Sequence, residues 1–191
     1  MAKLYFRYGA MNSGKSTAVL QVAHNYEERG MKVMIMKPGV DTKGEDHITS
    51  RIGNSRKVDA LLHPNDNVVS KLDDSVDCII TDEAQFFTPK QIEEFFEIAV
   101  ENNVPVICYG IRTDFQRNLF PGSKRLFELA HSLEELKTIC RCGKKAIFNG
   151  RKVNGKFVFE GTQVAIDGEE KVTYESLCGK CYLENKHQTH G

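Results

Sequence analysis

Apolar and polar positions alternate in blocks along the first part of the chain. Four mainly apolar runs each have the length of one strand: residues 3–8, 32–37, 76–80 and 104–110. Between the first two runs, apolar residues return at helical spacing from Val19 to Tyr26, and Gly30 offers a C-terminal cap. Apolar strands that alternate with helices are typical of a parallel sheet covered on both faces. The pattern predicts an α/β fold, although Arg7 makes the first strand unusually polar.

Capping residues mark where further helices begin. Thr88, Pro89 and Gln91 supply an N-cap, a proline at the first helical position and a capping-box partner. Ser123 is the expected N-cap of a shorter helix. Residues 40–56 are polar and aperiodic by contrast, and we expect them to form a mobile surface segment.

The alternation stops near Ile139. Beyond it, two strand-like runs flank Asn154 and Gly155, a dipeptide suited to a tight hairpin turn, and a glycine-containing loop follows. We therefore expect two domains: residues 1–139 as the α/β domain, and residues 140–191 as a small second domain.

Composition narrows the classes of function. Of 191 residues, 26 are Lys or Arg and 26 are Asp or Glu, so the chain has no general basic field that would attract a polyanion. A nucleic-acid polymer is not an expected partner. No run of about 20 apolar residues spans a membrane, and the start MAKLYFRYGAM lacks a leader-like apolar segment. We expect a cytoplasmic protein.

Residues 9–16 read GAMNSGKS and complete the pattern G-x-x-x-x-G-K-[ST] of a phosphate-binding loop between a strand and a helix. In such a loop the backbone N–H groups converge on the phosphates, the lysine reaches the outer phosphates, and the hydroxyl binds Mg²⁺. ATP and Mg²⁺ are the expected cofactors. The expected nucleotide contacts are Gly9, Ala10, Met11, Asn12, Ser13, Gly14, Lys15 and Ser16.

The third apolar run leads into an acidic pair. Asp82 is placed to hold Mg²⁺ together with Ser16, and Glu83 is placed to accept a proton from the oxygen that attacks the γ-phosphate. The same pair would serve water in an ATPase or a hydroxyl in a kinase. The loop and the carboxylates do not decide between these two activities.

Aromatic residues follow two of the strands. Phe86 comes directly after the acidic pair, and Phe115 and Phe120 lie in an irregular stretch after the fourth run. Ligands of parallel sheets bind outside the carboxyl ends of the strands, where these rings could stack on a flat ring of a substrate. Packing against the core is the alternative for each of them.

Four cysteines form two close pairs, Cys140-x-Cys142 and Cys178-x-x-Cys181. This spacing lets four thiolates meet one tetrahedral zinc, which would be structural because no coordination position stays open. A segment of about 50 residues has too little core to fold unaided, so a metal would stabilise it. Cys78 and Cys108 lie within apolar runs and are expected to be buried thiols.

Five segments together resemble one family: GAMNSGKST, TDEAQFF, YGIRTDFQRNLFPGS, LKTICRCGKKA and YESLCGKCY. Their order over nearly the whole chain is similar to that of the cytosolic, zinc-containing (type II) thymidine kinases. The resemblance implies a RecA-like α/β domain with a zinc-stapled lasso domain, usually assembled as a homotetramer. It also implies transfer of the γ-phosphate of ATP to the 5′-hydroxyl of thymidine, which gives dTMP for DNA synthesis, with feedback inhibition by dTTP.

The resemblance also implies roles for residues. Glu83 matches the catalytic base, and Ser16 and Asp82 match the magnesium partners. Further positions on the nucleotide side are Asp41, Thr42, Lys43, Ala84 and Gln85. Positions near the nucleoside are Met11, Phe86, Ile111, Phe115, Phe120, Asn149, Gln163, Val164, Ala165, Ile166, Asp167 and Tyr174. Lys43 stands where many members have arginine, and residues 166–174 form a longer segment than is common in the family.

Two other classes of function are alternatives to a nucleoside kinase. A RecA-like ATPase stimulated by single-stranded nucleic acid would hydrolyse ATP without a nucleoside, and the balanced charge argues against it. A zinc-ribbon binding module with a vestigial phosphate loop would show no turnover. The intact Lys15, Ser16, Asp82 and Glu83 argue against this second class.

Overall fold

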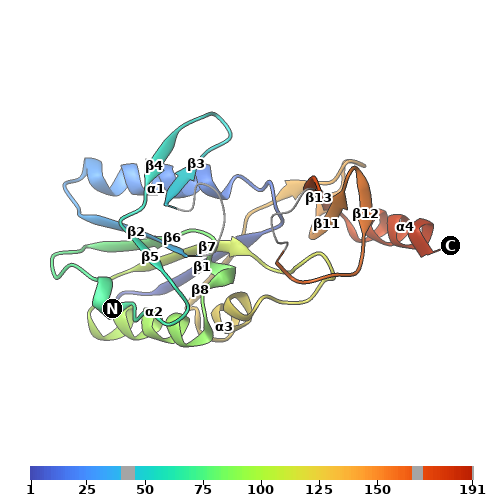
Figure 1. Cartoon of the computed structure of the whole chain (residues 1–191). Coiled ribbons are helices and arrows are strands. Elements are labelled where there is room, and N and C mark those ends of the chain that lie inside the picture. The colour runs from blue at the N-terminus through green and yellow to red at the C-terminus, as the bar shows by residue number, and fades with distance from the viewer. Residues whose placement is uncertain (40–45, 165–169, 191) are drawn as a thin grey trace.

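The computed structural model describes residues 1–39, 46–164 and 170–190 of the chain, with an α/β fold whose largest unit is a six-stranded parallel sheet (Figure 1). From one edge to the other the strands are β5 (Ala60–Leu62), β2 (Val33–Pro38), β6 (Cys78–Thr81), β7 (Val106–Ile111), β1 (Leu4–Gly9) and β8 (Ser132–Glu135). The predicted parallel sheet is confirmed. All four predicted strands lie in its interior.

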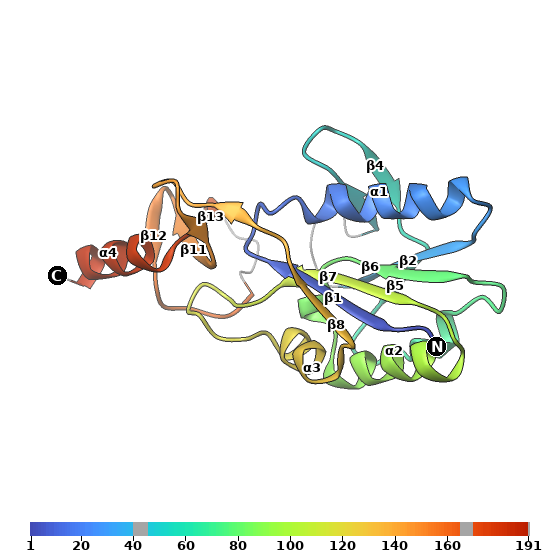
Figure 2. The same cartoon turned by 180° about the vertical axis from the view of Figure 1, so that it is seen from behind.

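Helices cover both faces of this sheet (Figures 1 and 2). Helix α1 (Lys15–Glu28) packs on one face, while α2 (Pro89–Glu101) and α3 (Pro121–Leu129) pack on the other. Successive side chains of a strand point to opposite faces. Thus Ile35 packs with α1, and its neighbour Met36 packs on the side of α2. The thiols of Cys78 and Cys108 are fully buried in these two cores, as predicted.

Arg7 is accommodated in β1 by partners on the adjacent strands. Its guanidinium donates a hydrogen bond to the Tyr109 hydroxyl at 2.6 Å and pairs with the Glu134 carboxylate at 3.3 Å. Because β8 is an edge strand and Glu134 reaches solvent, a cation can be held here beside an otherwise apolar core. The polar residue in the first run is thereby explained.

Of the two predicted helix starts, one is confirmed and one is wrong. Thr88 accepts from the Gln91 backbone N–H, and the Gln91 side chain accepts from the Thr88 N–H, which forms the predicted capping box of α2. Helix α3 begins at Pro121 instead of after Ser123. Proline at the first position fixes the helical φ, and Ser123 lies inside the helix, where its hydroxyl donates to the Ile111 carbonyl.

The prediction for residues 40–56 needs correction where they are described. Strands β3 (His47–Thr49) and β4 (Ser55–Lys57) pair as an antiparallel hairpin. Ile48 is only 2% exposed, because it packs in the same core as Val19 of α1. The edge strands β5 and β8 and the short 3₁₀ turns η1 (Val69–Lys71) and η2 (Ala84–Phe86) had no counterpart among the predicted elements.

The C-terminal part forms a separate small sheet at one end of the molecule (Figure 1). Strands β9 (Thr138–Ile139) and β10 (Lys145–Ala146) pair with each other, and the three-stranded sheet has the order β12 (Lys156–Val158), β11 (Phe148–Val153) and β13 (Val172–Leu177). Asn154 and Gly155 have φ values of 52° and 82° at the β11–β12 turn, which confirms the predicted hairpin. Helix α4 (Gly179–His190) follows.

Within the described ranges, none of the helices combines the length and the apolar character that crossing a membrane requires.

Candidate active site

The phosphate loop connects β1 to α1 at the carboxyl edge of the sheet. At Gly9 a β-carbon would lie 2.6 Å from the Leu136 carbonyl oxygen, so only glycine fits there. Gly14, with φ of 78°, caps α1. The loop therefore presents its backbone N–H groups at a helix N-terminus, where an anion is favoured.

Lys15 lies within this loop and faces two carboxylates. Its ammonium donates to the Ala10 carbonyl at 3.2 Å and to the Ser13 hydroxyl at 3.3 Å. Burial lowers the pKa of Lys15, and the charges of Glu83 and Asp82 act in the opposite direction. Phosphate oxygens would be further partners for this buried cation.

Asp82 extends from the end of β6 toward the first turn of α1. The Ser16 hydroxyl donates to the Asp82 carboxylate at 3.2 Å, and Asp82 is 3% exposed. Burial raises the pKa of Asp82, partly offset by the hydrogen bond from the Glu83 backbone N–H. A hydroxyl beside a carboxylate provides the oxygen ligands that Mg²⁺ prefers, so these two residues fit that ion.

Glu83 is held in an unusual conformation by its neighbours. Its φ of 55° is left-handed, a strained conformation found preferentially at functional sites. The Gln85 side-chain amide donates to the Glu83 carboxylate at 2.8 Å, and its oxygen accepts from the Ile111 N–H at 3.2 Å. Burial, followed by the negative charge of Asp82, raises the pKa of Glu83. A carboxylate with these features is suited to accept a proton.

Two cavities meet at Glu83. The first has a volume of about 410 Å³ and lies over the phosphate loop, and we call it the donor cavity. The second, the acceptor cavity, has a volume of about 230 Å³ and aromatic walls. The residues that line both are Met11, Glu83, Gln85, Ile111 and Tyr174. Glu83 thus forms part of the wall of both spaces.

The structure brings most of the predicted site residues to these walls. The donor cavity is lined by Met11, Asn12, Gly14, Lys15, Ser16, Glu83 and Gln85. The acceptor cavity is lined by Met11, Phe86, Ile111, Phe115, Phe120, Asn149, Gln163, Val164 and Tyr174. Neither wall includes Gly9, Ala10, Ser13, Asp82 or Ala84. Residues outside those described are Asp41, Thr42, Lys43, Ala165, Ile166 and Asp167.

The aromatic residues of the acceptor cavity are both packed and available to a ligand. Phe86 and Phe120 meet edge to face, with ring centroids 5.4 Å apart. Phe115 is 1% exposed and lies under the guanidinium of Arg151, at 3.8 Å from the ring centroid. Rings fixed in this way form a rigid wall for a flat, mainly apolar group.

Arg151 is a site residue that the sequence did not indicate. It is 5% exposed and lines the acceptor cavity. Its guanidinium donates to the carbonyls of Thr162 at 2.7 Å and Gln163 at 3.0 Å, and to the Tyr174 hydroxyl at 3.1 Å. Thr49, Arg51 and Thr173 line the donor cavity and were not predicted either. These residues belong to no linear motif, so only the folded chain reveals them.

The four paired cysteines converge. Their sulfur atoms all lie within 4.8 Å of one another, and the Sγ atoms of Cys142 and Cys178 are 3.6 Å apart. Zinc bound tetrahedrally at about 2.3 Å would place its sulfur ligands about 3.8 Å apart, so the cluster fits zinc. The backbone N–H of Cys181 lowers the pKa of the Cys178 thiol to about 7, whereas burial raises the pKa of the Cys181 thiol to about 12.

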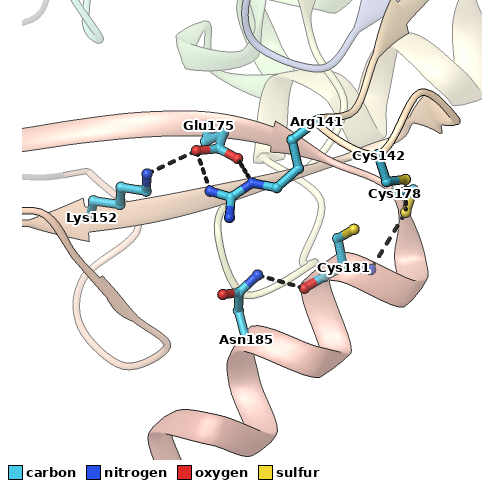
Figure 3. A network of polar contacts seen from close by, with 7 residues as sticks. All are labelled: Arg141, Cys142, Lys152, Glu175, Cys178, Cys181 and Asn185. Carbon is cyan, nitrogen blue, oxygen red and sulfur yellow. Dashed lines mark hydrogen bonds and ion pairs between the residues drawn. The ribbon is translucent and has the colours of Figure 1, made fainter.

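A charged network joins this cluster to β13. The Arg141 guanidinium, between two cysteines in sequence, forms a two-pronged pair with the Glu175 carboxylate (Figure 3). Lys152 of β11 donates to the same carboxylate at 2.8 Å. The network ties the first cysteine pair to the strand that leads into the second pair.

A phosphate loop at the carboxyl edge of a parallel sheet, with a buried glutamate between it and an aromatic cavity, is typical of a P-loop phosphotransferase that acts on a small molecule. A family model described as "Thymidine kinase" matches residues 2–182 of the chain. The chain therefore belongs to the thymidine kinase family, a family of nucleoside kinases that use ATP.

Curated relatives named "Thymidine kinase" match almost the whole chain. The protein of Chromobacterium violaceum is 46% identical over 184 residues, which cover 95% of this chain and 98% of the relative. The protein of Ruegeria pomeroyi is 44% identical, and the match covers 96% of this chain and 95% of the relative. That of Streptococcus pyogenes serotype M28 is also 44% identical, with 96% and 98% covered. The similarity extends over both the large sheet and the cysteine cluster.

Proposed function

We propose that this protein transfers the γ-phosphate of ATP to the 5′-hydroxyl of thymidine. The position of Glu83 in the walls of both cavities is the observation that supports this most strongly. A base between two spaces is what transfer to a second substrate requires, since one space holds the donor and the other the acceptor. The RecA-like ATPase is not favoured, because the family match is to kinases.

In the donor cavity, the phosphates of ATP would lie over the loop backbone, with Lys15 against the outer phosphates. Ser16 and Asp82 would hold Mg²⁺, an ion that supplies charge neutralisation at the phosphates when bound. The segment Asp41 to Lys43 is proposed to contact the phosphates as well. These residues position the γ-phosphate and offset its charge.

In the acceptor cavity, the thymine ring would lie among Phe86, Phe115 and Phe120, with Gln163, Val164 and Tyr174 in the remaining wall. The 5′-hydroxyl would then face Glu83. Its oxygen forms the new bond to the γ-phosphorus while the bond to the β–γ bridging oxygen breaks. Glu83 accepts the hydroxyl proton, and ADP and dTMP are the products.

Other features are proposed on the family resemblance. The four cysteines would hold a structural zinc in a lasso domain that starts near Ile139. The enzyme would act as a cytoplasmic homotetramer, inhibited by dTTP, and would bind no nucleic-acid polymer. The equal numbers of basic and acidic residues support this last point.

Labelled ATP with a panel of acceptors tests the function. We expect transfer of label to thymidine, no transfer to deoxycytidine, and little release of phosphate when no nucleoside is present. Single-stranded DNA without nucleoside is included as a further condition. Hydrolysis that depends on this DNA, without any labelled nucleotide product, would instead identify the RecA-like ATPase.

A further inference from the structure

Both backbone polar groups of Met11, inside the phosphate loop, are bound by side chains of the small sheet. The Met11 N–H donates to the side-chain oxygen of Asn149 at 2.7 Å. The Met11 carbonyl accepts a hydrogen bond from the Ser176 hydroxyl. Asn149 of β11 and Ser176 of β13 are direct partners in the strand register, so one residue pair of the small sheet holds one residue of the loop. We call this pair the Met11 clamp.

Asn149 also binds a third segment. Its side-chain NH₂ group donates to the Thr113 carbonyl at 2.9 Å, in the loop that follows β7 and lines the acceptor cavity. The side chain is 2% exposed, and both its oxygen and its nitrogen are bonded to backbone groups. Asn149 therefore connects the phosphate loop to the acceptor wall. The role near the nucleoside that the resemblance implies for it is thus exerted through the backbone.

The position of Met11 makes this connection important for both substrates. Met11 lines the donor and the acceptor cavities, and the loop continues through Asn12, whose carbonyl accepts from the Thr138 hydroxyl at 3.3 Å. Ser176 is 6% exposed and lines neither cavity itself. A small displacement of the Met11 backbone would shift the phosphates relative to the acceptor, and misplacement by about 1 Å can cost about 100-fold in rate.

We propose that Asn149 and Ser176 are positioning residues that fix the phosphate loop, and through it the alignment of the γ-phosphate with the acceptor hydroxyl. The alignment half of this inference rests on the proposed function. The nucleotide-binding half does not, because it concerns the loop alone.

The experiment compares Ser176→Thr with Ser176→Val in the full-length protein. The two side chains have nearly the same shape and differ in the hydroxyl that reaches the Met11 carbonyl. Binding of ADP is measured by calorimetry without nucleoside, and thymidine kinase kinetics follow. We expect the valine variant to bind ADP about tenfold more weakly than the threonine variant, the effect of one hydrogen bond. Its kcat should also fall, while the KM for thymidine stays unchanged.

Ser70→Ala is the matched control, because the Ser70 hydroxyl also donates to a backbone carbonyl, that of Asn67, but at an exposed site outside both cavities. Asn149→Ala should weaken ADP binding and, by freeing the Thr113 carbonyl, raise the KM for thymidine as well. Equal ADP binding by the threonine and valine variants would overturn the proposal. If the wild-type protein binds ADP but phosphorylates no nucleoside, the proposed function fails, and the calorimetry still tests the clamp.

Discussion

At the scale of single residues, Glu83 is the proposed catalytic base, because Gln85 donates to its carboxylate and Glu83 lines both cavities. Glu83→Gln keeps the size of the side chain but removes the proton acceptor. We expect kcat to fall by about 100- to 10,000-fold while ATP binding is retained. Single-turnover assays and calorimetry with ATP measure the two effects. Turnover close to that of the wild type would remove Glu83 from its role.

The environment of Glu83 also predicts the pH dependence of the enzyme. Burial and the charge of Asp82 raise its pKa above the 4.5 of an ordinary glutamate. A protonated carboxyl cannot accept the hydroxyl proton. On acidification, kcat/KM should therefore begin to fall at a higher pH than it would if Glu83 had an ordinary pKa. A pH profile of kcat/KM for thymidine checks this. A profile that stays flat down to pH 4.5 would contradict it.

The raised pKa of Glu83 also makes the stability of the folded protein depend on pH, and this stability falls as the pH rises. The folded protein holds the Glu83 proton more tightly than the unfolded chain does, so this contribution is present at low pH and is lost as the pH rises through the raised pKa. Without ligands at pH 8, Glu83→Gln should therefore melt a few degrees higher than the wild type, at about 2–4 °C per kcal/mol for a chain of this size. Calorimetric melting at pH 5 and pH 8 compares the two proteins. A lower melting temperature of Glu83→Gln at pH 8 would contradict this sign.

Arg151 gives a prediction for the acceptor side. Arg151→Lys replaces a guanidinium that binds two carbonyls and a hydroxyl by an ammonium without its planar fork. We expect the KM for thymidine to rise about tenfold, the loss of about one or two hydrogen bonds, with the KM for ATP unchanged. Arg125→Lys, an exposed site on α3 paired with Glu93, is the control. Equal effects on both KM values would show that Arg151 does not act on the acceptor side alone.

At the scale of elements, the cysteine cluster is connected to the phosphate loop through β13. Cys178 lies two residues after Ser176. Glu175, directly before Ser176, is paired with Arg141 (Figure 3). Removal of metal by a chelator should lower the melting temperature and weaken ADP binding, because the Met11 clamp loses its support. Addition of zinc should restore both values. If zinc is shown to be lost and ADP binding does not change, the cysteine cluster does not support the phosphate loop.

The interior strands of the large sheet were predictable from the sequence, and its edge strands were not. Strands β1, β2, β6 and β7 are mainly apolar because helices cover both faces of the sheet. The edge strand β8 has the sequence SLEE and half-exposed side chains, so periodicity does not distinguish it from a loop. Helix α4 lacks an apolar stripe, because Tyr182 and the cysteines make its main contacts with the small core.

The site divides in the same way. The donor side follows two short linear motifs, and the sequence therefore indicated Lys15 and Ser16 in the first and Asp82 and Glu83 in the second. Arg151 contacts residues that are at least 11 positions away in the sequence, starting with Thr162. Ser176 contacts Met11, which is 165 positions away. Such contacts leave no local pattern in one sequence.

At the scale of the whole molecule, the two sheets together form the site. The large sheet supplies the phosphate loop and the carboxylates, and the small sheet supplies Asn149, Arg151 and Tyr174 to the acceptor wall. The net charge is zero, so binding depends on local groups and not on a general field. The proposed chemistry requires that both substrates meet at the junction of these sheets.

A crystal structure with thymidine, Mg²⁺ and a non-hydrolysable ATP analogue tests this requirement most directly. We expect the 5′-oxygen of thymidine within about 2.6–3.2 Å of the Glu83 carboxylate, with the γ-phosphate of the analogue on the other side of that oxygen. A 5′-oxygen turned away from Glu83, with another side chain in hydrogen-bond contact, would contradict it.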